Sequence, residues 1–128
     1  MNLLLDTHAF LWWVNGDALP PLATAAIRNP ENAVWLSAAS AWELTIEASL
    51  GKLRLADRVA RFVETQLQQN AFGWLPFDAT ALDILQDLPF HHRDPFDRLL
   101  IAQAISQNYS LISAGRVFDQ YPVKKLWS

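Results

Sequence analysis

Four carboxylates stand in sequence contexts that could support metal-ion chemistry. Asp6 ends the apolar run of LLLDTH (3–8), Glu43 follows the run that ends at Ser37, and Asp94 and Asp97 begin the segment 94–104 (DPFDRLLIAQA). The chain has no cysteine, and its three histidines show no spacing typical of a zinc site. Carboxylate oxygens without such partners favour a hard cation, Mg²⁺ or Mn²⁺. Because such an ion activates water and stabilises an in-line displacement at phosphorus, the acids point to phosphoryl chemistry.

Each acid also has an ordinary structural explanation. Asp6 could cap the helix that follows it, and Ser40 with Glu43 spells the capping box S-x-x-E. Asp94 precedes a proline, as a cap does, and Asp97 then lies in the first helical turn, where the helix dipole favours acids. A cap can still bind a cation. We therefore expect Asp6, Glu43 and Asp97 to be metal ligands and catalytic residues, and Asp94 to be a cap first and an additional ligand second.

Other polar residues carry weaker signals. Thr7 and Ser37 could orient a metal-bound water or could simply satisfy backbone groups. Several basic residues could contact phosphates, although each alone is more typical of a solvated surface charge: Lys52, Arg54, Arg93, Arg98 and Arg116. The histidines are expected in ordinary surface or core roles: His8, His91 and His92.

The surrounding pattern predicts the elements that would bring the acids together. Short strand-like runs occupy 2–5, 33–37, 73–77, 110–113 and 123–127, and longer segments with helical spacing lie between them. The clearest helical segment is 57–69, where apolar residues recur on one face. This alternation predicts an α/β fold of about five short parallel strands flanked by helices. Since parallel strands place their sites beyond their carboxyl ends, the four acids should converge on one edge.

Composition limits the class of protein. The 128 residues suit a single domain spanning 1–128, and 52% apolar against 18% charged residues favour a packed core over disorder. No run approaches the length of a membrane span, no signal-like segment begins the chain, and the absence of cysteine fits a reducing compartment. We therefore expect a cytoplasmic protein with no membrane association. The formal charge of −3 gives no general attraction to nucleic acid, so a polyanion would need local basic groups or bound cations.

The aromatic content is high, with six Trp and seven Phe. Phe10, Leu11, Trp12 and Trp13 form a run of four bulky residues, and a helix can point only about half of such a run at its own core. We expect Trp12 or Trp13 to face outward and to be buried by a partner protein or a second subunit. The alternative is that neighbouring helices cover both indoles.

Three blocks together resemble the conserved blocks of PIN-domain toxins of the VapC type. They are LLLDTHAFLWW (3–13), SAASAWELTIEASLGKL (37–53) and HHRDPFDRLLIAQA (91–104), and the likeness runs from Asp6 to Trp127. The resemblance implies a PIN-like three-layer sandwich and a Mg²⁺-dependent endoribonuclease. It also implies a homodimer and a cognate antitoxin. The family's first three acids fall on Asp6, Glu43 and Asp97, with Asp94 as a less certain addition.

One block departs from the family pattern. A T-x-D step commonly supplies a fourth acid after the fourth strand, whereas this chain has Ser113, Ala114 and Gly115, with Asp119 a turn farther on. Three carboxylates can still hold one Mg²⁺, which keeps several waters, but a second ion is not supported. An alternative reading is therefore a PIN-fold binding module weakened in catalysis. A haloacid-dehalogenase-type phosphatase fits less well, because its second aspartate would fall at His8.

Overall fold

The computed structural model describes all residues 1–128 and contains one five-stranded sheet in which every pair of strands is parallel. The strands are β1 (Asn2–Leu5), β2 (Ala33–Ser37), β3 (Gly73–Leu75), β4 (Ser110–Ile112) and β5 (Lys124–Leu126). Their order across the sheet is β3-β2-β1-β4-β5. The α/β fold with five short parallel strands is therefore confirmed.

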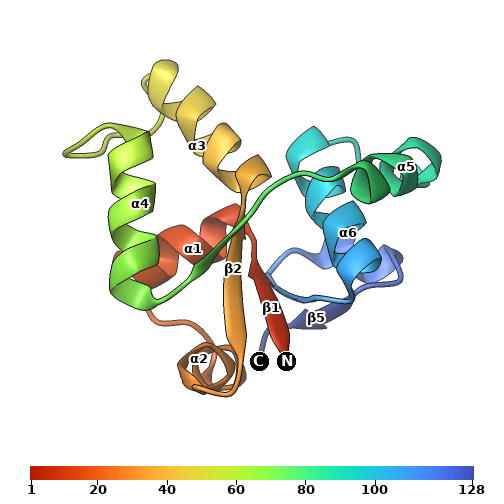
Figure 1. The fold of residues 1–128 in the computed structure, drawn as a ribbon, viewed down its shortest axis with the longest axis horizontal. Coiled ribbons are helices and arrows are strands. Elements are labelled where there is room, and N and C mark those ends of the chain that lie inside the picture. The colour runs from red at the N-terminus through yellow and green to blue at the C-terminus, as the bar shows by residue number, and fades with distance from the viewer.

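Helices cover both faces of this sheet (Figure 1). The helices α1 (Thr7–Val14), α2 (Pro21–Arg28), α3 (Ala38–Ser49) and α4 (Val59–Asn70) contribute to the core on one face. The helices α5 (Ala79–Asp87) and α6 (Pro95–Gln107) and the 3₁₀ helix η1 (Arg116–Gln120) pack on the other. The expected three-layer sandwich is thus present. None of its helices combines the length and apolar character required to cross a membrane.

The central strand β1 fixes both layers through the alternation of its leucines. Leu3 and Leu5 belong to the core under α1–α4, whereas Leu4 belongs to the core under α6, and all three are fully buried. Burial of a leucine side chain contributes about 2 kcal/mol. A shift of β1 by one residue would move each leucine to the opposite face, so this alternation sets the register that places Asp6 at the end of the strand.

Three strands are shorter than the sequence suggests. β4 ends at Ile112 rather than at position 113. β3 ends at Leu75 rather than at position 77 because its partner residue Ser37 is the last of β2. β5 covers 124–126 rather than 123–127 because β4 offers only three partners. The helix expected over 57–69 is α4, which begins at Val59 and ends at Asn70.

The two tryptophans of α1, Trp12 and Trp13, differ in exposure. Trp12 is 36% exposed, and its ring centroid lies 5.6 Å from that of Trp127. Trp13 is half-buried, and its Nε1–H donates to Asn70 Oδ1 at 3.0 Å. The prediction that at least one indole faces outward is confirmed; its burial by a partner stays a prediction.

Candidate metal centre

The site lies where the direction of the chain across the sheet reverses. From β1 the chain moves outward through β2 to β3, and it then returns to β4 on the other side of β1. Crevices for ligands form beyond the carboxyl ends of the two strands at such a switch point. Asp6 directly follows β1, and Ser113 directly follows β4. These two residues therefore occupy the place where an open α/β sheet positions its chemistry.

Asp6 is held firmly at this edge. Its extended backbone makes it the N-cap of α1, and its Oδ1 accepts the Ala9 N–H at 2.7 Å. The Ser113 hydroxyl favours the ionised form of this carboxylate, and the Asp6 residue is only 8% exposed. The cap expected from the sequence is present, and it orients the carboxylate at the mouth of the switch point.

Glu43 reaches the site from the second turn of α3 and does not form the expected capping box. Ser37 caps this helix, with its Oγ accepting the Ala39 N–H at 3.0 Å, so Ser40 lies inside the helix and not before it. That interpretation was wrong because the helix begins directly after β2. Glu43 Oε1 instead accepts the hydroxyl of buried Thr7 at 2.6 Å. Thr7 therefore orients an acid from another segment, directly beside Asp6.

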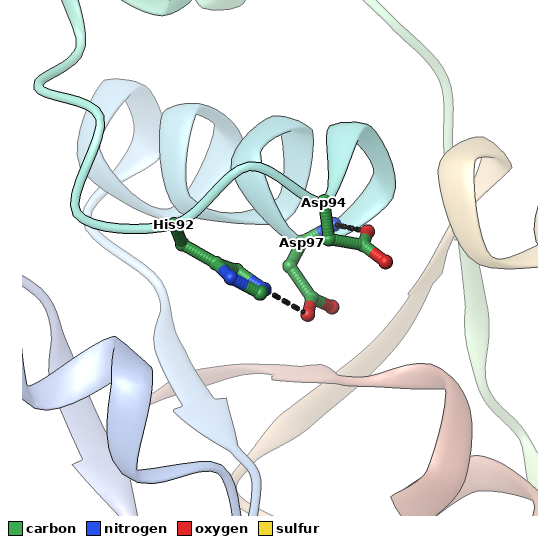
Figure 2. A group of neighbouring side chains, drawn as sticks. All are labelled: His92, Asp94 and Asp97. Atoms are coloured by element: carbon green, nitrogen blue, oxygen red, sulfur yellow. Dashed lines mark hydrogen bonds and ion pairs between the residues drawn. The ribbon is translucent and has the colours of Figure 1, made fainter.

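Asp94 and Asp97 stand at the start of α6 in the arrangement that the sequence suggests. Asp94 is the N-cap, and its Oδ1 accepts the Asp97 N–H at 2.9 Å. Asp97 keeps its own carboxylate free of the helix, and its Oδ2 lies 2.8 Å from His92 Nε2. Figure 2 shows the three side chains grouped around the first turn of α6. His92, Asp94 and Asp97 offer ligand atoms that all lie within 4.8 Å of one another.

The electrostatics connect these segments. Burial is the main cause that raises the pKa of Asp6, of Glu43 and of Asp97. Hydrogen bonds from Ser113, Thr7 and His92 act in the opposite direction and favour the ionised forms. The charges of Asp94 and Asp97 raise the pKa of Glu43 further, and the charges of Asp94 and Asp6 raise that of Asp97. Acids from three segments that are distant in sequence therefore interact through their charges across the space between Asp6, Glu43 and Asp97, which we call the shared space.

The residues fit a divalent cation. No lysine or arginine pairs with any of these acids; the ion pairs of the chain are Arg61–Asp57, His92–Asp97 and Lys125–Asp119. The hydroxyl of Ser40, one turn before Glu43, is buried without a hydrogen-bond partner. A hydrated Mg²⁺ or Mn²⁺ would relieve the repulsion and prefers oxygen ligands. Of the three expected ligands, only Asp97 belongs to the close group, and Asp6 and Glu43 act on the site through their charges.

Comparison with known proteins gives a family and a fold. The PIN domain matches residues 3–124, which is nearly the whole chain. The chain belongs to the PIN domain family. The family expected from the sequence is thus confirmed.

Solved structures share the fold of this PIN domain at low sequence identity. A chain in the crystal structure of VapBC2 from Rickettsia felis bound to a DNA fragment from their promoter is 17% identical, with a TM-score of 0.75 and 100% of both chains covered. A chain of FitAcB from Neisseria gonorrhoeae is 17% identical, with a TM-score of 0.58 and coverage of 97% and 96%. FitAB bound to the IR36 DNA fragment gives 17% identity, a TM-score of 0.61 and coverage of 97% and 93%. No curated protein matches the chain.

Two expected site residues have structural roles in this PIN domain. Arg98, suggested as a phosphate contact, is only 5% exposed, and its guanidinium donates to the carbonyls of Leu88, Pro89 and His92. That suggestion was wrong, because the side chain is buried and its guanidinium binds three backbone carbonyls. Ser37 is fully buried, caps α3 and donates to Gln103, which is the second of the two roles considered for it.

The other basic candidates are on the surface. Each is exposed and forms no ion pair: Lys52, Arg54, Arg93 and Arg116. Arg93 directly precedes Asp94, beside the acids. Lys52 and Arg54 belong to the segment between α3 and α4, which lies at the end of α3 far from the sheet (Figure 1). Arg93 is therefore the basic residue best placed to meet a phosphate at the site.

The position of the family's fourth acid is filled differently here. Gly115 follows Ser113, and a Cβ at this position would lie 3.0 Å from the Phe118 ring and 3.3 Å from Ser113 Oγ. Asp119 does not take the place of the acid, because its carboxylate binds Lys125 Nζ at 2.9 Å. The acids at this edge therefore come from the end of β1, from α3 and from the start of α6.

Two functional contacts were not expected from the sequence. Ser113 could have been found, because the residue that follows β4 must lie beside the residue that follows β1 at the switch point. His92 gave no such signal. Its approach to Asp97 depends on the path of an irregular segment, which no periodicity reveals.

Proposed function

We propose that this PIN domain is a divalent-metal-dependent endoribonuclease that acts as the toxin of a toxin–antitoxin pair. The observation that carries the proposal is the close group of His92, Asp94 and Asp97, whose acids interact through their charges with Glu43 and Asp6. Burial raises the pKa of Asp6, Glu43 and Asp97, and the charges of neighbouring acids raise the pKa of Glu43 and of Asp97 further. No lysine or arginine pairs with any of these carboxylates. Such a site attracts a divalent cation and repels a phosphodiester until the cation is bound.

The residues of the site would have separate roles in metal binding, in orientation of the ligands and in contact with the RNA. When bound, Mg²⁺ or Mn²⁺ supplies the Lewis acid that activates water and stabilises charge at phosphorus. Asp6, Glu43 and Asp97 would hold the ion, with Asp94 near enough to contribute an additional oxygen. Thr7 and Ser113 keep Glu43 and Asp6 in fixed orientations by hydrogen bonding. The exposed guanidinium of Arg93 would contact a backbone phosphate of the RNA.

The toxin role is supported by the sequence blocks and by the partners of similar structures. The blocks resemble VapC-type toxins, and the similar folds occur in the VapBC2 and FitAB complexes. We accordingly expect a homodimer and a cognate antitoxin, in a chain that works as one domain in the cytoplasm. Large exposed apolar side chains on α1, α3 and β3 offer surface for such partners: Trp12, Trp42 and Trp74. Exposed patches of this kind typically mark interaction sites.

Cleavage of RNA by the purified chain, free of antitoxin, tests the proposal. We expect cleavage with Mg²⁺ or Mn²⁺, none in EDTA, and none with Asp97→Asn. Asp83→Asn is a matched control, because Asp83 is an exposed acid of α5 that pairs with no basic residue. Full activity in EDTA, or in Asp97→Asn, would contradict the proposed mechanism.

The alternative of a PIN-fold binding module rests on one observation, the replacement of the fourth acid by Gly115. This alternative predicts an antitoxin complex of normal stability and no cleavage of any RNA with either metal. Assays of antitoxin binding and of RNA cleavage on the same protein preparation therefore distinguish the two functions.

A further inference from the structure

The segment that joins α5 to α6 is fixed by a buried cation rather than by secondary structure. Arg98 Nη1 donates to the carbonyls of Pro89 at 3.0 Å and of His92 at 3.2 Å, and Nη2 donates to the carbonyl of Leu88 at 3.0 Å. The guanidinium also lies 3.9 Å from the centroid of the Phe90 ring. One buried side chain of α6 therefore holds three carbonyls of the segment in place.

A second buried side chain, that of Tyr121, also holds this segment. Tyr121, which follows η1, donates its hydroxyl proton to the Pro89 carbonyl at 2.7 Å. The same hydroxyl oxygen accepts the backbone N–H of His92 at 3.0 Å. Both backbone polar groups of His92 are thus engaged, the N–H by Tyr121 and the carbonyl by Arg98. The backbone of His92 cannot shift without breaking one of these bonds.

This fixed backbone directs the imidazole at one carboxylate. His92 Nε2 lies 2.8 Å from Asp97 Oδ2. A dashed line marks this contact in Figure 2. Because an ionised carboxylate only accepts hydrogen bonds, Nε2 carries the proton of this bond. Asp97 Oδ1 has no hydrogen-bond partner within the protein, and the Asp97 backbone N–H is taken by Asp94. The imidazole thereby holds one oxygen of Asp97 and leaves the other free.

We propose that His92 is a positioning residue for Asp97. It fixes the carboxylate through Oδ2 so that Oδ1 faces the shared space with Glu43 and Asp6. In this role His92 itself binds neither the metal nor the substrate, and it acts only through Asp97. Partners of this kind, which orient a ligand without touching the ion, typically change metal affinity about 10–100-fold when they are removed. The part of this inference that concerns metal affinity rests on the proposed function.

Replacement by leucine and by glutamine distinguishes positioning from direct ligation. Leucine removes the donor at similar bulk, whereas glutamine carries an N–H donor at a reach comparable to that of Nε2 but has no imidazole nitrogen for a metal. His91→Gln is the matched control, because His91 is exposed and its ring packs against the edge of Tyr121 without a hydrogen bond to the acids. Thermal melts check that each variant is folded.

The experiment measures Mn²⁺ affinity by titration calorimetry for the wild type and the three variants. We expect His92→Leu to bind Mn²⁺ about 10–100-fold more weakly, and His92→Gln and His91→Gln to bind close to wild type. Wild-type affinity in His92→Leu would overturn the inference. Equal loss in His92→Leu and His92→Gln would also overturn it, because the ring nitrogen would then be a ligand.

A crystal structure of metal-free His92→Leu separates this inference from the proposed function. Positioning requires the Asp97 carboxylate to leave its wild-type orientation in this variant, and an unmoved carboxylate would overturn the inference. If the wild type binds no Mn²⁺ while Asp97 moves in His92→Leu, the metal mechanism fails and the positioning role stands.

Discussion

Replacement of Arg98 by methionine tests whether this buried cation organises the site. Methionine keeps most of the apolar stem but removes three charge-assisted hydrogen bonds, each with a net contribution of about 1.5–3 kcal/mol. The exposed Pro89 carbonyl can regain water, whereas the carbonyl of buried Leu88 has no ready replacement. We therefore expect a loss of about 3–5 kcal/mol, because bonds to a charged donor are lost and a buried carbonyl is left without a partner.

Urea unfolding and thermal melts would measure this loss. For a domain of this size about 4 kcal/mol corresponds to a fall in Tm of roughly 10–15 °C. Arg93→Met is the matched control, because Arg93 is exposed and unpaired, and its stability should change by less than about 0.5 kcal/mol. A loss below about 1 kcal/mol for Arg98→Met, with reduced RNA affinity, would refute the structural role and restore Arg98 as a phosphate contact.

Three further predictions follow from the geometry of the site and its surface. Asp6→Asn keeps a capping oxygen and removes a carboxylate that burial disfavours in its ionised form, as its raised pKa indicates. In EDTA at pH 7, urea unfolding should therefore show that the variant is as stable as the wild type or more stable. That difference should vanish as pH falls through the raised pKa towards the ordinary aspartate range, and a less stable variant at pH 7 would contradict it. Trp12→Ser should cost less than about 1 kcal/mol in the isolated chain, whereas Trp13→Ser should cost about 3 kcal/mol; equal losses by urea unfolding would show that Trp12 is not a surface residue. Gly115→Asp should cost about 1–2 kcal/mol because its Cβ crowds the Phe118 ring, yet should tighten Mn²⁺ binding; unchanged affinity by calorimetry would place position 115 outside the metal centre.

Much of the fold could be predicted from local sequence patterns, because the strands and helix caps that these patterns indicate are kept in the folded chain. The runs at 2–5 and 33–37 match β1 and β2 because their apolar residues face helices on both sides and their ends coincide with helix caps. Asp6 and Asp94 cap their helices as expected, since an acid at a strand-to-helix or loop-to-helix junction satisfies free N–H groups. Strand ends were less accurate, because a strand stops where its neighbour stops and the neighbour is not local in sequence.

The candidate site was predictable where residue type and strand order suffice. The positions of Asp6, Glu43 and Asp97 at one edge depend only on parallel strands and on helices that begin at that edge. The burial of Arg98 and the approach of His92 to Asp97 depend on the irregular segment before α6, whose path is set by contacts from η1 and α6. A sequence shows that an arginine is present but not that its guanidinium finds three carbonyls inside the protein.

The central claim is that Asp6, Glu43 and Asp97 hold one divalent cation at the carboxyl ends of β1 and β4. Anomalous diffraction from crystals soaked in Mn²⁺ tests this claim most directly. We expect a single strong peak at this edge, about 2.1 Å from oxygens of Asp6 and Asp97, with Glu43 bound directly or through a water. Crystals with no peak at this edge, or with Mn²⁺ held only by acids elsewhere on the surface, would contradict it.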